Sequence, residues 1–469
     1  MNSLHTSMIH SAMVHNHMDT FKVKMDNVGK LSDLLAKSWR SFVATGNVQS
    51  YKNGLTLTRK IADAITLSAL KQHDSLLACN MSWYNPINKR APVNVESATG
   101  KIIGIVVNTK ISPGDVYASK IGAGSEIAVV EMAQELANLG HSVYVFCNID
   151  YTVEWKYCIA GRNPQFLPMD KPDHFSAFIA PASPGFYRCL SDLLLREPGD
   201  YALDHLIVWR TYHIEYVNFN NYAPKLTYWS HDVAMPGTRF DFTPHRIFTL
   251  TNYHTEQLKK TFGDDYEYVV GCNGTMVDTS MPIVPRTKET HFNVCYASNY
   301  VRGLGELLSI WPGIFKTVPQ AKLFIYYGRQ TWGLMNEAEM AELVKKITAL
   351  KPFGVTEMCV EGALPHKELL KEFEKMSVFC YPYIGESETF SIVSAAAQQL
   401  GVITAVRKRH GLVETCSAQP CDLLENNEIR DYVVKILQTP EEELMELREK
   451  HKSATLKYTW AEAARVMAE

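Results

Sequence analysis

The chain has 469 residues, of which 46% are hydrophobic and 21% are charged, and its formal net charge is -3. This length predicts two or three domains, and the composition is ordinary for a soluble globular enzyme. A charge so close to neutral argues against broad electrostatic binding of nucleic acid or of an anionic membrane, and it leaves room for a local basic site.

Residues 1–100 differ in pattern from the rest of the chain. Four histidines lie near their start, at His5, His10, His15 and His17. These histidines could bind a metal, but we favour a disordered, compositionally biased tail, and the polar residues among them interrupt the apolar stretch that a signal peptide needs. Apolar residues at helical spacing in 31–46 and 55–73 predict a small helical hairpin. We assign this extension no chemistry.

The cysteines indicate the cellular setting. The ten cysteines form no CxxC pair and no Cys/His spacing typical of zinc sites, and several lie inside apolar runs such as VYVFC. No run approaches the roughly 20 apolar residues that a membrane-spanning helix needs. We therefore expect a reducing, cytoplasmic setting, with at most peripheral contact with a membrane.

Alternating strands and helices begin at residue 101. KIIGIVV is an apolar, β-rich run, and the helical pattern SEIAVVEMAQELANLG follows it and ends at Gly140. HSVYVFCNI is the next predicted strand. Further predicted strands are FSAFIA (175–180), DHLIVWR (204–210), KLTYWS (225–230) and HRIFTLT (245–251). This alternation predicts a parallel sheet covered by helices on both faces, in a first domain over 101–285.

A second alternating series follows the proline-bounded segment MPIVPRTKET, which is typical of an interdomain linker. It opens with the predicted strand HFNVCYA and the helix RGLGELLSIWPGIFKTV, whose apolar face holds Leu304, Leu307, Leu308, Trp311, Phe315 and Val318. Further predicted strands are 322–328, 356–362, 377–383 and 401–406, and further predicted helices are 336–351, 365–376, 390–401, 441–451 and 459–467. We predict a second doubly wound domain over 286–440 and C-terminal helices over 441–469.

Ligands of open parallel sheets bind beyond the carboxyl ends of the strands, in loops that open helices. The first such loop is IGAGSEIAVV. Gly122 and Gly124 would let the backbone approach a ligand closely, and the helix start offers free N–H groups. A tight strand-to-helix turn explains these glycines equally well. The loop does not match GxGxxG, so the fingerprint of a dinucleotide site is absent.

Two loops of the second domain carry charged residues at helix starts. In YASNYVRGLGELL, Arg302 and Gly303 open a helix directly after a strand, where a guanidinium can neutralise a phosphate. In PYIGESETFSIVSAAAQQLG, Glu388 could accept hydrogen bonds from sugar hydroxyls, and the amides of the following residues, Thr389, Phe390 and Ser391, would point toward an anion. The simpler alternatives are a solvated arginine and a carboxylate that only caps a helix.

A fourth candidate lies in KLTYWSHDVAMPG, where His231 and Asp232 follow a strand of the first domain. A histidine at this position could contact phosphate or substrate. A structural role is the competing interpretation, and the adjacency of His231 and Asp232 does not make a catalytic dyad.

In this order, these stretches resemble the large retaining glycosyltransferase family commonly called family four, which has the GT-B fold. The similarity covers about residues 101–469. IGAGSEIAVVEMAQELANLGHSVYVF resembles the opening glycine loop, helix and strand of that family, and HRIFTLTNYHTEQLKKTFG with VVGCNGTMVD resembles its next conserved segments. YASNYVRGLGELLSIWPGIFKTVPQAKLFIYYG and GALPHKELLKEFEKMSVFCYPYIGESETFSIVSAAAQQLG resemble the donor domain, and KYTWAEAARVM resembles the terminal helix that returns to the first domain.

The resemblance implies an α/β, GT-B fold, with two Rossmann-like domains that face a cleft, and a role for each matching residue. Arg302 falls where the family has its phosphate-binding lysine, before Gly303. Glu388 matches the first glutamate of a Glu-x7-Glu motif that contacts the donor sugar. The loop that binds the donor diphosphate in the family matches Thr389, Phe390 and Ser391. His231 matches a histidine near the reacting centre. The loop that faces donor and acceptor matches Gly122 and Gly124.

Two positions depart from the family pattern. The second glutamate of the motif, a ribose contact, falls on Ala396, and the family's arginine before the lysine falls on Tyr296. Ribose recognition is then lost or moved to another residue, and the phosphate contact rests on Arg302. These departures support an alternative interpretation, in which the chain is a catalytically impaired sugar-nucleotide-binding or assembly protein of the same fold.

The resemblance as a whole implies transfer of a sugar from a nucleotide-sugar donor to a glycan or other hydroxyl acceptor, with retention of configuration, without a metal or other cofactor and without nucleic acid as a partner. A sugar-nucleotide epimerase would need further acid/base carboxylates that we cannot place, and a nicotinamide-dependent oxidoreductase would need the absent glycine fingerprint. The donor base and sugar, the acceptor and the oligomeric state stay open.

Overall fold

The computed structural model describes residues 100–117, 124–148, 163–168, 203–211, 223–240, 242–329, 335–420 and 423–469. The predicted helical extension, Gly122 and the predicted strand at 175–180 lie outside these ranges. The chain divides into two compact units. The described residues of the first unit fall within 100–111, 140–227 and 240–244, and those of the second fall within 112–139, 228–239 and 245–469. The domain boundaries at 285 and 440 remain predictions.

The first sheet has seven strands in the order β3-β2-β1-β4-β5-β6-β7. These are β1 (Ile102–Lys110), β2 (Ser142–Asn148), β3 (Gln165–Pro168), β4 (His205–Trp209), β5 (Lys225–Trp229), β6 (Arg246–Thr249) and β7 (Glu267–Val270). β1 pairs in parallel with both β2 and β4. The five residues of β4 are all buried, as expected for a parallel strand whose two faces are covered. Nε2 of His205 in β4 lies 2.7 Å from the hydroxyl oxygen of Thr227 in β5.

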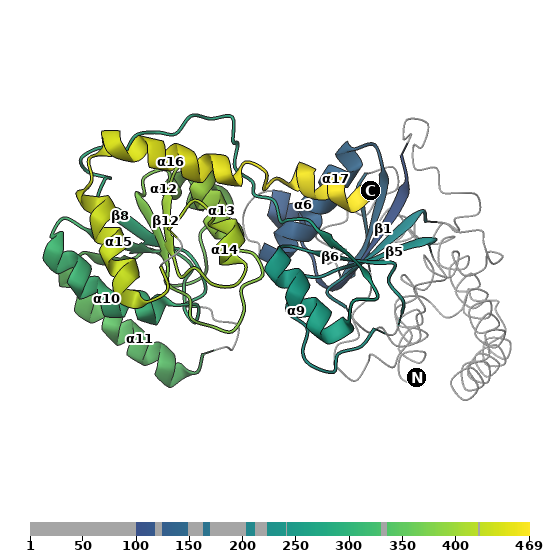
Figure 1. Ribbon diagram of the computed structural model, residues 1–469, viewed down its shortest axis with the longest axis horizontal. Coiled ribbons are helices and arrows are strands. Elements are labelled where there is room, and N and C mark those ends of the chain that lie inside the picture. The colour runs from purple at the N-terminus through teal and green to yellow at the C-terminus, as the bar shows by residue number, and fades with distance from the viewer. Residues whose placement is uncertain are drawn as a thin grey trace, which may run out of the picture. The chain divides into compact units, whose positions relative to one another are not determined.

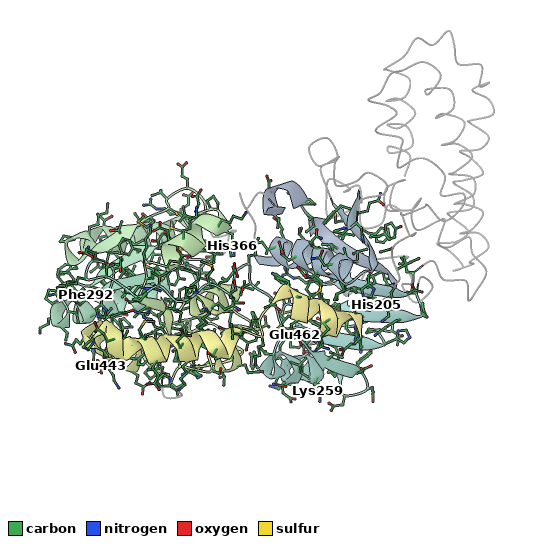
Figure 2. All side chains as sticks on the ribbon, turned by 90° about the horizontal axis from the view of Figure 1, so that it is seen from above. His205, Lys259, Phe292, His366, Glu443 and Glu462 are labelled. Carbon is green, nitrogen blue, oxygen red and sulfur yellow. The ribbon has the colours of Figure 1, made fainter. Side chains whose placement is uncertain are left out.

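Four of the described helices lie outside the segment of the chain that forms the second domain's sheet and its covering helices. They are α5 (Pro113–Tyr117), α6 (Gly124–Asn138), α9 (Asn252–Phe262) and the C-terminal α17 (Trp460–Ala468). The predicted end of α6 is confirmed, because Gly140 follows it with a φ of 88°, which favours glycine. α17 packs against α6, and both belong to the second unit. Glu462 marks the first turn of α17 in Figure 2.

The second sheet is entirely parallel and has the strand order β10-β9-β8-β11-β12. Its strands are β8 (Asn293–Tyr296), β9 (Lys322–Ile325), β10 (Val355–Glu357), β11 (Val378–Tyr381) and β12 (Ile403–Val406). The strand predicted at 356–362 is wrong in its extent. The chain leaves the sheet after Glu357, and the carbonyl of Val360 accepts a hydrogen bond from the N–H of Arg329 instead.

Helices cover both faces of the second sheet. They are α10 (Leu304–Thr317), α11 (Glu337–Leu350), α12 (His366–Phe373), α13 (Ile392–Gln399), α14 (Leu412–Thr415), α15 (Asn426–Gln438) and α16 (Glu441–Thr455), with a short 3-10 helix at Lys351–Phe353. α10 packs against α11 and α15, whereas α13 packs against α12 and α16 (Figure 1). The predicted doubly wound arrangement is therefore confirmed for this domain.

The apolar face of α10 anchors it to the core of this second domain. The predicted residues Leu304, Leu307, Leu308 and Trp311 are buried. Phe315 is a partial exception, because it is half-buried and packs edge-on against Phe353, while Ile314 next to it is fully buried. This anchoring holds the start of α10, and therefore the loop before it, at the carboxyl end of β8.

Two features are absent from the described part of the chain. No helix there is long and apolar enough to cross a membrane. No group of three or more histidine, cysteine, aspartate or glutamate side chains comes together there in a way that could hold a metal ion.

Candidate functional site

The loop between β8 and α10 places a cation at the end of a strand. Gly303 is the N-cap of α10 and has a φ of 94°, and no side chain caps the helix. A Cβ atom added at Gly303 would lie 2.9 Å from the carbonyl carbon of Pro382 and from the backbone nitrogen of Tyr383. Only glycine fits this position, and it brings the β8–α10 loop against the chain that leaves β11.

Arg302 and Glu388 meet at this point. Nη1 of Arg302 lies 2.9 Å from Oε2 of Glu388, and the side chain of Arg302 is 41% exposed whereas that of Glu388 is 8% exposed. Burial raises the pKa of Glu388, and the neighbouring Arg302 guanidinium opposes this rise. The carboxylate is thus shielded behind an arginine that a ligand can reach. The sequence predicted both residues for one site, and the structure brings them into direct contact.

Tyr296 does not supply the cation that the family pattern has at its position. It is fully buried, and its hydroxyl lies 2.6 Å from the carbonyl oxygen of Asn299 and 3.0 Å from that of Arg302. A phenol with its proton shared between two carbonyls fixes the turn that presents Arg302. The departure at Tyr296 therefore has a structural role in this chain.

The turn at 388–391 is held by its own side chains and by neighbours. The N–H of Phe390 donates to the carboxylate of Glu388, so this amide is already engaged. Ser391 is the N-cap of α13, and its hydroxyl accepts a hydrogen bond from the N–H of Ser394. Thr389 donates its hydroxyl proton to the carbonyl oxygen of His231 at 2.7 Å. These hydrogen bonds therefore fix the conformation of the turn.

His231 and Gly124 lie near this turn, within the second unit. The carbonyl of His231 accepts the hydrogen bond from Thr389, and its half-buried ring lies 4.9 Å from the ring of Trp229. Gly124 is the first residue of α6, and a Cβ atom there would lie 3.6 Å from Cδ1 of Ile392, at the start of α13. Of the predicted site residues, only Gly122 lies outside the described ranges.

Solved structures match most of the chain, although no protein-family model matches it and no curated protein matches it. HepE from Anabaena, in complex with UDP and glucose, is 13% identical with a TM-score of 0.55, over 78% of this chain and 98% of that chain. WaaG, a glycosyltransferase involved in lipopolysaccharide biosynthesis, is 13% identical with a TM-score of 0.51, over 78% of this chain and 99% of that chain. The N-terminal domain of trehalose-6-phosphate phosphatase from Candida albicans is 10% identical with a TM-score of 0.55, over 79% of this chain and 96% of that chain.

The fold is GT-B. At identities of 13% or less, the likeness shows the fold alone. What this GT-B chain binds has to be argued from its own residues.

Two aromatic residues next to the Arg302–Glu388 pair, Tyr381 and Tyr383, were not predicted as site residues from the sequence. Tyr381 is fully buried and donates its hydroxyl proton to Oε2 of Glu388 at 2.8 Å. Tyr383 stacks on Tyr381 with 5.7 Å between ring centroids, and the guanidinium of Arg302 lies 5.7 Å from the centroid of Tyr383. The YPY run at the end of the predicted strand could have indicated them, because alternate residues of a strand share a face and the two tyrosines would therefore lie together.

A second polar cluster lies at the ends of β9 and β10. Both carboxylate oxygens of Glu357 accept hydrogen bonds from Arg329, at 2.9 and 2.6 Å. Tyr300 donates its hydroxyl proton to the same carboxylate at 3.0 Å. The pKa of Glu357 is lowered overall, because these hydrogen bonds outweigh its burial. This cluster and the Arg302–Glu388 pair occupy the same edge of the sheet, on neighbouring strands.

Ala396 gives the site no polar group. It lies in α13 and is fully buried. The departure noted in the sequence is therefore also a feature of the structure, because no side-chain oxygen is present at this position to contact a ribose.

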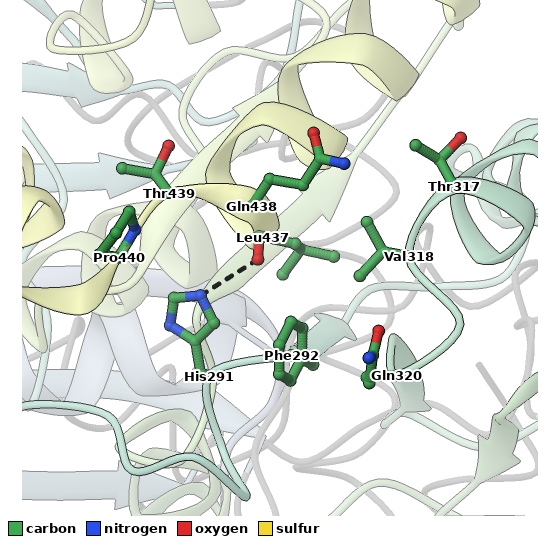
Figure 3. Close-up of a pocket in the computed structure, with 9 residues that line it drawn as sticks. All are labelled: His291, Phe292, Thr317, Val318, Gln320, Leu437, Gln438, Thr439 and Pro440. Atoms are coloured by element: carbon green, nitrogen blue, oxygen red, sulfur yellow. Dashed lines mark hydrogen bonds between the residues drawn. The ribbon is translucent and has the colours of Figure 1, made fainter.

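A pocket of about 360 Å³ lies at the opposite ends of the strands (Figure 3). His291 and Phe292 of its wall precede β8, and Gln320 precedes β9, whereas the candidate site follows the strands. Nε2 of His291 donates a hydrogen bond to the carbonyl of Leu437 at 3.1 Å. This pocket lies at the amino ends of the strands, whereas Arg302 and Glu388 lie beyond their carboxyl ends. The pocket is therefore separate from the candidate site.

Proposed function

We propose that the chain is a glycosyltransferase that uses a nucleotide-activated sugar as donor. The observation that carries this proposal is the contact between Arg302 and Glu388, at 2.9 Å, beside a helix start without a side-chain cap. A reachable guanidinium and free helix amides suit a diphosphate, and a carboxylate next to them suits sugar hydroxyls. That the structure of HepE, a protein of similar fold, contains UDP and glucose supports this assignment.

Donor binding then requires Arg302 to exchange partners. Its guanidinium contacts Glu388 and lies over the ring of Tyr383. A diphosphate offers more negative charge than one carboxylate, so Arg302 turns toward it and Glu388 becomes available to the donor sugar. Tyr381 and the amide of Phe390 keep the released carboxylate in place.

The main energetic requirement of the transfer step is stabilisation of the diphosphate leaving group. The bond between the anomeric carbon and the phosphate oxygen breaks, and a bond forms between that carbon and the acceptor oxygen on the same face. The acceptor proton passes to the departing phosphate oxygen. Arg302, the amides at the start of α10 and those of Thr389 and Ser391 stabilise the negative charge that develops on the diphosphate. Retention of configuration and independence of metal ions are part of this proposal.

The nucleoside end of the donor lies toward β9 and β10 in this arrangement. With the diphosphate at Arg302, which follows β8, and the sugar at Glu388, which follows β11, the nucleoside extends along the edge in the other direction. There it meets the cluster of Tyr300, Arg329 and Glu357. Hydroxyl contacts to the ribose come from this region in our proposal, since Ala396 supplies none.

One observation favours a second function, that of a protein which binds a sugar nucleotide without turning it over. The two positions at which the chain departs from the family pattern, Tyr296 and Ala396, are both fully buried. Neither offers a polar group to a donor. A chain with a decayed site would retain the fold and part of the donor affinity.

A donor screen separates the two functions. UDP-, GDP- and ADP-sugars are added to the full chain, and thermal shift reports binding. Release of free nucleotide is then measured with mixed glycan acceptors, with and without EDTA, and product NMR gives the anomeric configuration. We expect one class of donor to raise the melting temperature and to be turned over in EDTA. A shift without turnover would establish the binding-only function, and no shift with any donor would reject both.

A further inference from the structure

Two aromatic side chains stack on each other next to the turn that carries Glu388. The ring centroids of Tyr253 and His410 lie 5.1 Å apart, with an interplanar angle of 8°. Tyr253 belongs to the first turn of α9, and His410 lies in the loop between β12 and α14. Both side chains are half-buried and both belong to the second unit. We call this pair of residues the ring platform.

His410 has a backbone conformation that ordinary side chains avoid. Its φ is 58°, in the left-handed region, and among the described residues only Arg210 shares this feature without being glycine. Glycine would adopt this conformation without strain. Residues that keep such strain cluster at ligand sites. A histidine at this position therefore points to a use for its imidazole ring.

The ring platform is fixed on both sides. The carboxylate of Glu414 accepts hydrogen bonds from the N–H groups of Asn252 and Tyr253, each at 3.0 Å, and from the side-chain amide of Asn252 at 2.8 Å. This contact orients the first turn of α9. On the other side, the N–H of Gly411 donates to the carbonyl of Glu388 at 2.8 Å. The rings are thus held beside the residue assigned to the donor sugar.

Tyr383 continues the aromatic surface toward Arg302. The guanidinium of Arg302 lies 5.7 Å from the centroid of the Tyr383 ring. The pKa of Tyr253 is raised by burial and further by Tyr383, as expected for phenols that are neighbours. Aromatic side chains therefore lie both beside Arg302, at Tyr383, and at the ring platform.

The order of the strands shows which ligand the ring platform meets. Arg302 follows β8, Glu388 follows β11 and His410 follows β12, and these three strands are consecutive in the sheet. Neighbouring strands lie about 4.8 Å apart. With the diphosphate at Arg302 and the donor sugar at Glu388, a group at the end of β12 lies beyond the donor sugar and away from the nucleoside. Under the proposed function, this position beyond the donor sugar is the one left for the acceptor.

We propose that the ring platform of Tyr253 and His410 binds the acceptor through a sugar ring. The inference rests on the proposed function. A sugar ring has an apolar C–H face that packs on aromatic rings, with hydroxyls around it for polar contacts. The charged side chains nearby already have partners: Arg409 pairs with Glu425 at 3.3 Å, and Glu414 caps α9. The surroundings therefore suit an uncharged sugar better than a phosphorylated one.

The test removes each ring without disturbing the backbone. His410→Gly keeps the left-handed conformation at no cost, and Tyr253→Leu keeps an apolar side chain on α9. Tyr253→Phe is the matched control, because it retains the ring. Methyl α- and β-D-glucopyranoside are the probes, and saturation-transfer-difference NMR measures their binding to the full chain loaded with the nucleoside diphosphate of the donor that the screen identifies. Donor affinity is measured by titration of the nucleotide sugar that the donor screen identifies.

We expect the C–H protons of a probe to receive saturation in the wild-type chain and in Tyr253→Phe. In His410→Gly and Tyr253→Leu, the dissociation constant of the probe from a saturation-transfer titration should rise by about tenfold, a change of about 1.4 kcal/mol in binding. Donor affinity should stay within about twofold, and His410→Gly should melt no lower than wild type. Equal probe signals in all four proteins, or none in the wild type, would overturn the inference. Weaker donor binding in both ring-deleted variants would show that the rings contact the donor. If the proposed function itself is wrong, the wild-type chain binds no donor at all.

Discussion

Tyr381 and Arg302 contact the same carboxylate oxygen, Oε2 of Glu388, at 2.8 and 2.9 Å. The phenol is fully buried, and the hydrogen bond that it donates lowers the pKa of a carboxyl group whose pKa burial raises. Hydrogen bonds to a charged group contribute about 1.5–3 kcal/mol. Tyr381 is therefore a positioning residue for Glu388, and its effect can be measured separately.

Tyr381→Phe should lower kcat/KM for the donor by about tenfold to a hundredfold, and it should move the acidic limb of the pH–rate profile upward. The reason is that loss of the phenol proton raises the pKa of Glu388 further. A pH–rate profile of both proteins, with thermal unfolding as a control of folding, checks this. An unchanged acidic limb would show that Tyr381 only fills space.

Arg302→Ala and Glu388→Ala should each remove most of the transfer activity without unfolding the chain. Loss of one group that stabilises the leaving group costs about 2.7–4 kcal/mol, or about a hundredfold to a thousandfold in kcat. Arg302→Lys should recover part of this rate, because it retains the positive charge. Arg465→Ala is a matched control, since this arginine is an exposed partner of Glu462 on α17 and makes no contact with Arg302 or Glu388 among its ion pairs. Turnover near the wild-type rate in both Ala variants would remove these residues from the site.

Gly303→Ala should lower activity and stability together. The new Cβ atom would lie 2.9 Å from the backbone of Pro382 and Tyr383, at a φ of 94° that alanine avoids. The β8–α10 loop must then shift, and Arg302 shifts with it. Gly305→Ala is the control, because nothing lies within 4 Å of its added Cβ atom and alanine favours a helix. Circular-dichroism melting and nucleotide release are the measurements, and similar results for the two variants would contradict the argument.

Much of the order of strands and helices was predictable, because many elements carry their own local signal, although β3 and β7 were not predicted. Apolar runs such as that of β4 and glycine stops such as Gly140 depend only on nearby residues. The helix α15 (426–438) was not predicted, although the helical spacing of Ile429, Val433 and Ile436, which are buried on one face, was visible in the sequence. The end of β10 was misplaced because the contact of Val360 with Arg329 involves a distant segment.

The candidate site was predictable only in part. Arg302 and Glu388 were found because a charged residue after a strand is visible in the sequence. Their direct contact, and the stack of Tyr253 on His410, join elements that are far apart along the chain. The role of Tyr296 was also hidden, because a tyrosine in a strand gives no sign that its hydroxyl will hold the following turn.

Acid should destabilise the fold through His254. Its ring is fully buried and neutral, with Nδ1 accepting the N–H of Leu250 at 3.3 Å and Nε2 donating to the carbonyl of Asp232 at 3.1 Å. Burial lowers the pKa of His254 to about 4 from an ordinary value of 6.5. Because the unfolded chain takes up this proton first, stability is complete above pH 6.5 and is lost as the pH falls toward 4.

The expected loss is at most about 3 kcal/mol over this window. Urea unfolding of the wild type and of His254→Asn at several pH values in this window isolates the contribution, since all other groups titrate equally in both proteins. The variant should be less stable than the wild type at neutral pH, because it leaves a gap in the core, and the difference between the two should shrink as the pH falls. A difference that stays constant across the window would show that His254 is not held neutral by the fold. The N–H of Leu250 would then not have a neutral Nδ1 of His254 as its acceptor.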